Sequence, residues 1–125
     1  MILVDTSVWI DHLRTANANL ARLLGDGAVL SHPWVTGELA LDNLGNRAEV
    51  IALLRNLPRA TVAADEEVLG LIDRATLAGT GIGFVDAALL AATRLTPDAK
   101  LWTRDKRLSA VAVRLGVGFA PPSER

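Results

Sequence analysis

Short apolar runs alternate with longer amphipathic segments along this 125-residue chain. Three of the runs have the composition of strands, at residues 2–5, 28–30 and 100–103. Continuous apolar runs are typical of strands that are buried on both faces of a parallel sheet. We therefore predict an α/β fold, a three-layer α/β/α domain with a central parallel sheet.

Helices are predicted between these runs, where apolar residues recur at helical spacing and Gly, Asn or Pro ends several segments. The predicted helices span residues 8–13, 18–24, 33–44, 47–57, 65–77, 84–95 and 105–115. Weaker strand signals lie at 61–63 and 117–119. We expect a single domain over residues 1–125, in which the tail from about 120 to 125, with two prolines, is frayed.

Composition limits the chemistry that the chain can perform. It has no cysteine, which excludes disulfides, zinc–thiolate sites and thiol catalysis. Its two histidines, His12 and His32, share no metal-ligand spacing. The formal net charge is −1, so a nucleic acid would have to be held by a local basic patch.

The first strand-like run begins at residue 2, which leaves no room for a secretory signal peptide. No apolar stretch approaches the roughly 18 residues that span a bilayer. We therefore expect a soluble, cytoplasmic protein.

Most of the fourteen acidic residues lie in turns, in first turns of helices or on polar helix faces. Four differ, because each has apolar neighbours or follows a buried strand: Asp5, Glu38, Asp86 and Asp105. Asp5 and Asp105 follow predicted strands, and open α/β sheets bind ligands at the carboxyl ends of their strands. The four acids are therefore candidates for one site.

Glu38 is the clearest of the four acids. On a helix its near neighbours are Trp34, Val35 and Leu41, which predicts that Glu38 lies on the stripe that faces the core. An unpaired carboxylate is costly in that position. A functional role would explain it.

The other three acids also have structural interpretations. Asp105 is a suitable N-cap for the helix that it precedes. Asp86 is a first-turn acid, which the helix dipole favours. Asp5 is suited to bonding its own backbone in a strand-to-helix turn. Three of the four acids are expected at one sheet edge, and Glu38 follows the second strand closely enough to join them. Coincidence of all four is therefore less plausible than a shared site.

Clustered carboxylates repel one another, by roughly 4 kcal/mol for two unit charges 4 Å apart at an effective dielectric of 20. With no histidine or cysteine at hand, the natural compensation is a hard divalent cation. Ligand sets made only of oxygen select Mg²⁺ or Mn²⁺ over zinc. Such an ion activates water for attack on a phosphodiester.

Four segments carry a resemblance to a known family. They are "MILVDTSVWIDHL", "GELAL", "GIGFVDAALLAAT" and "LWTRDKRL", in that order along the chain. Together they resemble the PIN-domain ribonucleases, and specifically the VapC toxins of bacterial toxin–antitoxin pairs, to about Ala120. The resemblance implies a PIN-like fold and a Mg²⁺-dependent endoribonuclease, with Mn²⁺ as a substitute, that cleaves structured RNA such as tRNA or rRNA. It also implies a homodimer that is silenced by a VapB-type antitoxin.

The family's acidic residues fall, position by position, on the four acids singled out above. We expect Asp5 and Asp86 to be the principal metal ligands. Glu38 and Asp105 would bind through water or orient it.

Hydroxyl groups of the family pattern fall on Thr103, before the last acid, and on Ser7. Either is a candidate to hydrogen-bond the attacking water or the scissile phosphate, and a capping or turn role is the alternative for both. Asp42, one turn beyond Glu38, is a candidate supporting residue, with a solvated polar face as the alternative.

RNA contact is expected from the basic residues around the fourth acid, Arg104, Lys106 and Arg107, and from Arg14. Arginine suits bidentate capture of phosphate. The alternative is a solvated charge run beside a helix start. The near-neutral net charge predicts modest salt dependence of RNA binding.

Two other families also begin with a strand that ends on Asp. Haloacid-dehalogenase-like phosphatases need a second Asp two residues later, where this chain has Ser7. Response-regulator receivers need paired acids and a late lysine. A rival of another class is a catalytically idle PIN fold that only binds a partner or RNA. Acids at all four positions argue against it.

Overall fold

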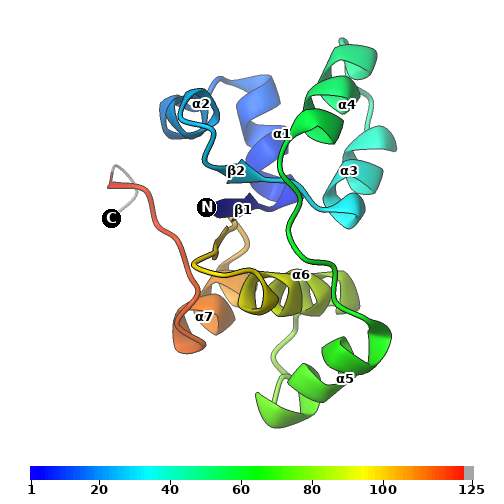
Figure 1. The fold of residues 1–125 in the computed structure, drawn as a ribbon, viewed down its shortest axis with the longest axis vertical. Coiled ribbons are helices and arrows are strands. Elements are labelled where there is room, and N and C mark those ends of the chain that lie inside the picture. The colour runs from blue at the N-terminus through cyan, green and yellow to red at the C-terminus, as the bar shows by residue number, and fades with distance from the viewer. Residues whose placement is uncertain (123–125) are drawn as a thin grey trace.

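A computed structural model describes residues 1–122 of the chain, and a parallel sheet of three strands runs through its centre (Figure 1). The strands are β1 (Ile2–Val4), β2 (Val29–Leu30) and β3 (Lys100–Trp102). Their order is β2-β1-β3, with Leu3 opposite both Leu30 and Leu101. The predicted parallel sheet is confirmed.

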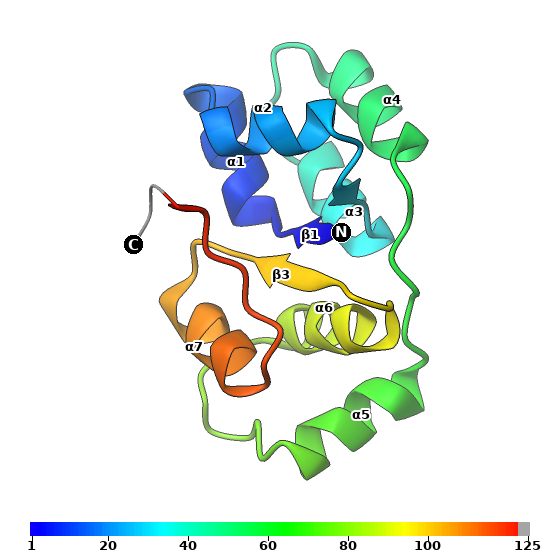
Figure 2. The ribbon, with the colours of Figure 1, turned by 60° about the vertical axis from the view of Figure 1, so that its left-hand side comes forward.

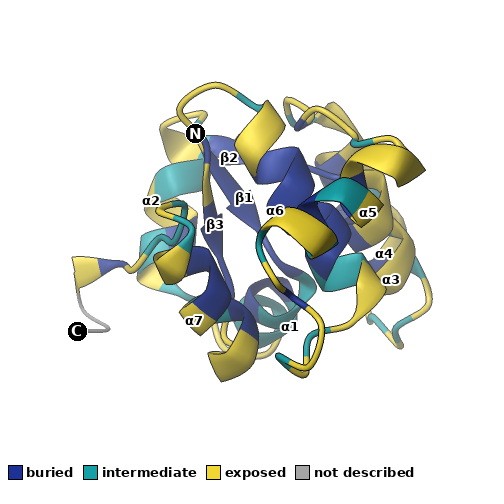
Figure 3. Ribbon diagram, turned by 90° about the horizontal axis from the view of Figure 1, so that it is seen from below, coloured by how far each residue is buried: buried dark blue, intermediate teal, exposed yellow. Residues whose placement is uncertain are grey.

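Seven helices surround the strands within the described residues: α1 (Thr6–Arg14), α2 (Ala18–Gly25), α3 (Pro33–Ala40), α4 (Arg47–Asn56), α5 (Asp65–Arg74), α6 (Phe84–Leu95) and α7 (Lys106–Arg114). In Figure 3 the strands lie between α2 on one side and α6 on the other. Figure 2 shows α6 between β3 and α5. The predicted three-layer α/β/α fold is confirmed.

The core is built from aliphatic residues, as the composition predicts. α6 is its central helix, because every residue from Ala87 to Thr93 is buried. Four of these seven residues are alanine, and such small side chains allow the helix to approach its neighbours closely. Trp9 and Trp102 are the largest fully buried side chains.

Two helices end earlier than predicted. The helix predicted to reach residue 44 ends at Ala40, and Asp42 then accepts a hydrogen bond of 2.9 Å from the Asn43 amide. Such a local side-chain bond competes with the helical pattern. The helix predicted to reach residue 77 ends at Arg74, because Thr76 has a positive φ of 54°.

Neither of the two weakly predicted strands, at 61–63 and 117–119, forms a strand. At 61–63 no strand forms, and the Thr61 amide donates to the Thr96 hydroxyl at 2.9 Å. At 117–119 the chain makes one isolated parallel bridge, between Leu101 and Gly118. The chain there extends the sheet beyond β3 by a single residue pair.

The predicted frayed tail lies partly outside the described residues, which stop at 122. Within the described part of that tail, Pro121 is buried. No helix over residues 1–122 is both long and apolar enough to cross a bilayer.

Candidate active site at the carboxyl end of the sheet

The strand order places a topological switch point at β1. From β1 the chain moves to β2 on one side, and it returns later to β3 on the other. Asp5 follows β1, and Thr103 and Asp105 follow β3. The Asp5 amide donates to the Trp102 carbonyl at 2.9 Å, which joins the two strand ends. This is the position at which open α/β sheets bind ligands.

Asp5 is a buried carboxylate, with 7% of its surface exposed. Its Oδ2 accepts hydrogen bonds from the hydroxyls of Ser7 and Thr103, each at 2.8 Å. These two bonds compensate for the burial of the charge. Its Oδ1 accepts no hydrogen bond from residues 1–122, so it is the oxygen left for a ligand.

The two hydroxyls also accept hydrogen bonds from the loop that follows β3. The Thr103 hydroxyl accepts from the Asp105 amide at 3.1 Å. The Ser7 hydroxyl accepts from the Arg104 amide at 3.0 Å. Because each hydroxyl proton is already donated to Asp5, the geometry favours a positioning role for Ser7 and Thr103.

Asp105 caps α7, as its structural interpretation predicts. Its Oδ1 accepts from the amides of Arg107 and Leu108, at 2.9 and 3.0 Å. The carboxylate is fixed by these two bonds, and its Oδ2 makes no hydrogen bond to the described residues. Capping and ligand binding are therefore compatible at Asp105.

Asp86 is the electrostatic centre of the site. It is the third residue of α6, and its Oδ2 accepts from the Gly83 amide at 3.2 Å. Burial is the largest cause that raises the pKa of Asp86, and the Gly83 hydrogen bond partly offsets it. The charges of the other three acids, Asp5, Asp105 and Glu38, raise this pKa further. The charges of all three other acids therefore reach Asp86.

Glu38 reaches this region from an exposed position. The prediction that it lies on a core-facing stripe was wrong, because Trp34 is 49% exposed and Leu41 is 91% exposed. α3 is apolar almost all round, so helical spacing alone did not identify its buried face. The buried residues of α3 are Val35 and Leu39. The Thr6 hydroxyl donates to Glu38 Oε1 at 2.6 Å and orients the carboxylate.

Thr6 is a site residue that the sequence reasoning missed. It directly follows Asp5, where a hydroxyl is typical of an ordinary helix cap. Only its contact with Glu38, 32 residues away, reveals the second role.

The donor set at this edge consists of carboxylate and hydroxyl oxygens. Both histidines have structural tasks instead: His12 Nδ1 accepts from the Asn17 amide, and His32 Nδ1 accepts from the Trp34 amide. Burial, with a smaller contribution from the Arg59 charge, lowers the pKa of His32 to about 4.

Across residues 1–122, no three acidic or histidine side chains converge into a preformed metal cage. Mg²⁺ usually keeps several water molecules and contacts only one or two carboxylates directly. A set of oxygen ligands whose negative charges repel one another at Asp86 suits such an ion.

The predicted RNA-binding residues are exposed, and they have different surroundings. Arg104 Nη1 lies 3.8 Å from Asp11 Oδ2. Lys106 and Arg107 lie in the first turn of α7, next to Asp105. The Arg107 side chain lies against Gly81, where an added Cβ would come within 2.9 Å of Arg107 Cδ.

Two further predicted residues lie outside the contacts described above. Arg14 is the last residue of α1 and is exposed. Asp42 lies beyond the end of α3, and its charge is not among those that raise the pKa of Asp86.

Comparison with known proteins covers nearly the whole chain. The family model described as "PIN domain" matches residues 2–114. Two curated relatives, each named Ribonuclease VapC32 and found in two strains of Mycobacterium tuberculosis, are 52% identical to this chain over 120 residues. The match spans 96% of this chain and 97% of each relative. Asp5, Glu38, Asp86 and Asp105 all lie within the residues that the family model matches.

Proposed function

This chain belongs to the PIN-domain family and to its VapC type, and we propose that it is a divalent-cation-dependent endoribonuclease toxin. The observation that carries the proposal is that the charges of Asp5, Asp105 and Glu38 all reach Asp86 and add to the burial that raises its pKa, at the sheet edge where ligands bind. The name of the VapC32 relatives supports ribonuclease activity. The substrate class is structured RNA, such as tRNA or rRNA.

The cation is Mg²⁺, for which Mn²⁺ can substitute. Asp5 and Asp86 would be its principal ligands, with Glu38 and Asp105 acting through water. When bound, it would lower the pKa of a water molecule and offset the negative charge on the scissile phosphate.

The protein's own residues prepare this site in two ways. Ser7 and Thr103 hold the Asp5 carboxylate in place by donating to the same oxygen. Thr6 directs Glu38. Fixed carboxylates reduce the reorganisation that accompanies the reaction, which is how a preformed site accelerates chemistry.

Partners follow from the same family. The proposed partners are a VapB-type antitoxin and a second copy of the chain, which would meet each other and the RNA in the cytoplasm. Trp34 in α3, Leu41 just after α3 and Leu53 in α4 are exposed, and association would remove this apolar surface from water. RNA contact is proposed for Arg104, Lys106, Arg107 and Arg14.

The test is cleavage of a structured RNA by the purified chain with Mg²⁺, with Mn²⁺ and with EDTA. Wild-type protein should cleave only with a divalent cation. Asp5→Asn should lower the rate by on the order of 100-fold or more, the scale seen when a charge-stabilising group is removed. Asp26→Asn, in the turn after α2, should cleave like wild type. Equal cleavage by wild type and Asp5→Asn would remove the assignment.

The catalytically idle alternative gives a different result. Such a protein would bind RNA or antitoxin without cleaving RNA under any of these conditions. Coexpression with the product of a small adjacent upstream reading frame tests the antitoxin: a complex that no longer cleaves RNA is expected.

A further inference from the structure

Three arginines from three different helices line one cavity away from the acidic site. Arg74 ends α5, Arg94 lies in the last turn of α6, and Arg114 ends α7. The cavity has a volume of about 370 Å³, and no acidic residue lines it.

This cavity shares lining residues with two others. Arg114 also lines a cavity of about 470 Å³ with Lys106 and Arg107, at the start of α7. On the other side, Arg74 and Arg94 line a cavity of about 460 Å³ between α5 and α6. We call the surface formed by these five cations the basic groove.

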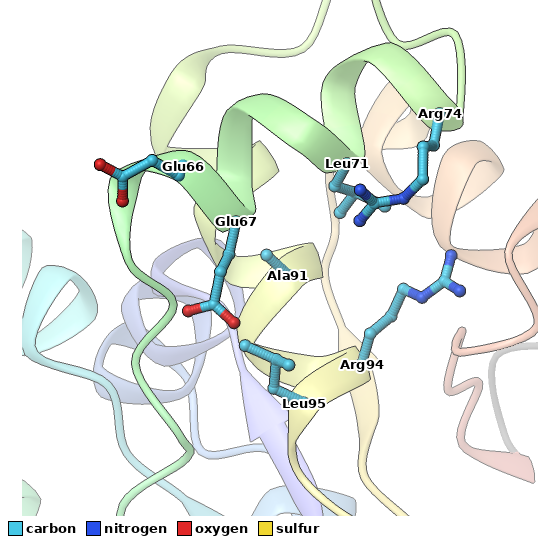
Figure 4. A pocket seen from close by; sticks show the side chains of 7 residues that line it. All are labelled: Glu66, Glu67, Leu71, Arg74, Ala91, Arg94 and Leu95. Carbon is cyan, nitrogen blue, oxygen red and sulfur yellow. The ribbon is translucent and has the colours of Figure 1, made fainter.

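Acidic residues mark where the basic groove ends. Figure 4 shows Arg74 and Arg94 at one end of the cavity between α5 and α6, and Glu66 and Glu67 at the other. At its opposite end the basic groove reaches Lys106, which directly follows Asp105. It therefore leads away from the candidate active site.

No salt bridge to an acid in the described part of the chain involves the cations of the basic groove. All five are exposed, and none has a carboxylate within 4 Å among residues 1–122. Like charges gathered without a partner repel one another, and a bound polyanion relieves that repulsion.

Two glycines allow guanidinium groups of the basic groove to lie close to the backbone. A Cβ on Gly70 would lie 2.8 Å from Arg74 Nη1. A Cβ on Gly81 would lie 2.9 Å from Arg107 Cδ and 3.1 Å from its Nη1. The absence of side chains at these two positions leaves space that the two arginine side chains occupy.

Helix dipoles account for only part of this arrangement. Cations are favourable in the last turn of any helix, and Arg55 in the last turn of α4 is an example. The dipole does not explain why Arg74, Arg94 and Arg114 line the same cavity.

We infer that the basic groove binds the phosphate backbone of RNA at a distance from the scissile phosphodiester. A succession of adjoining cavities fits a chain of phosphates better than a single small anion. No aromatic residue lines these cavities, which favours backbone contact over stacking of bases. This inference rests on the proposed function, because it extends the substrate contact of that same site.

The test is binding of a fluorescent structured RNA to the full chain in EDTA, read by anisotropy at several salt concentrations. The double variant Arg94→Gln/Arg114→Gln should bind about tenfold more weakly, since phosphate contacts supply most of such affinity. The slope of log affinity against log salt should fall by about two, one for each lost contact. Arg55→Gln, also a last-turn arginine, should match wild type.

A cleavage assay adds a second readout. With Mg²⁺, the double variant should raise KM for the structured RNA and leave kcat for a short oligonucleotide that spans only the cleavage site unchanged. If the nuclease proposal fails, wild type will show no cation-dependent cleavage. The basic groove is tested separately, because the anisotropy measurement in EDTA requires no cleavage.

Three results would overturn the inference. The first is wild-type affinity and salt slope in the double variant. The second is a changed sedimentation mass with unchanged RNA binding, which would make the basic groove an interface between copies. The third is that the double variant loses binding to polyglutamate and keeps its binding to RNA, which would make the basic groove a site for acidic protein segments.

Discussion

The Thr103 hydroxyl donates a hydrogen bond of 2.8 Å to Asp5 Oδ2, although the two residues are 98 positions apart in the chain. Asp5 follows β1 and Thr103 follows β3, so the bond joins neighbouring strands at the proposed site. Ser7 donates to the same oxygen. The orientation of Asp5 therefore depends on these two hydroxyls.

Thr103→Val removes one of these donors and keeps the shape of the side chain. We expect RNA cleavage to slow by about 10- to 100-fold, the range seen when a residue that orients a metal ligand is lost. Thr103→Ser should restore most of the rate. The measurement is the initial rate of cleavage at saturating Mg²⁺.

Thr93→Val is the matched control for that change. Thr93 is also buried, and its hydroxyl donates to the Leu89 carbonyl at 2.8 Å within α6. Both variants should lose about 1 kcal/mol of stability, but only Thr103→Val should lose activity. Equal activity in the two variants would contradict the positioning role of Thr103.

Asp86→Asn should raise the melting temperature at pH 7 in EDTA. Burial, and to a smaller extent the charges of Asp5, Asp105 and Glu38, raise the pKa of Asp86, so the folded state binds its proton more tightly than the unfolded state does. The free energy of unfolding then falls as pH rises from the ordinary pKa through the raised one, and the loss persists at neutral pH. Asp86→Asn does not ionise at this position, so its free energy of unfolding does not fall in this way.

Thermal unfolding between pH 3 and pH 8 measures the effect. The difference between Asp86→Asn and wild type should disappear below the ordinary aspartate pKa of about 3.9. Glu67→Gln is the control. Glu67 is also the third residue of its helix, and its side chain accepts a hydrogen bond from the amide of Ala64, the residue before the helix. A variant Asp86→Asn that is less stable than wild type at pH 7 would favour a purely capping role.

Gly81→Ala should weaken RNA binding by displacing Arg107. Gly81 has a φ of +87°, and its added Cβ would come within 2.9 Å of the Arg107 side chain. Gly79→Ala separates this contact from backbone strain, because Gly79 has a φ of +82° and nothing within 4 Å of an added Cβ. Each variant should lose roughly 1 to 2 kcal/mol of stability.

RNA affinity measured by anisotropy then distinguishes the two glycine variants. We expect Gly81→Ala to bind several-fold more weakly than Gly79→Ala, since only Gly81→Ala moves a guanidinium group that is proposed to contact phosphate. Equal affinities would show that the place of Arg107 over Gly81 has no part in RNA binding.

The sequence predicted those parts of the fold that depend on local patterns. The α6 boundaries, residues 84–95, were predicted correctly, because Gly83 precedes the helix and Pro97 follows it closely. The proximity of Asp5 to the residues that follow β3 followed from a general property of parallel sheets, whose carboxyl ends share one edge.

Other features depend on contacts that no local pattern encodes. Helical spacing gave the wrong buried face for α3, because Trp34 and Leu41, which follows the helix, look like core residues but are exposed. The basic groove combines the ends of three helices, and its arginines look like ordinary last-turn cations in the sequence. Tertiary packing alone brings them together.

Binding of Mn²⁺ to the full chain, measured by isothermal titration calorimetry without RNA, tests most directly whether the four acids form one cation site. We predict that wild type and Asp26→Asn bind Mn²⁺ alike. Asp5→Asn and Asp86→Asn should each bind it on the order of tenfold more weakly or worse, since even loss of a residue that supports a ligand has that effect. Unchanged binding in both Asp5→Asn and Asp86→Asn, or no binding to wild type, would contradict a shared cation site.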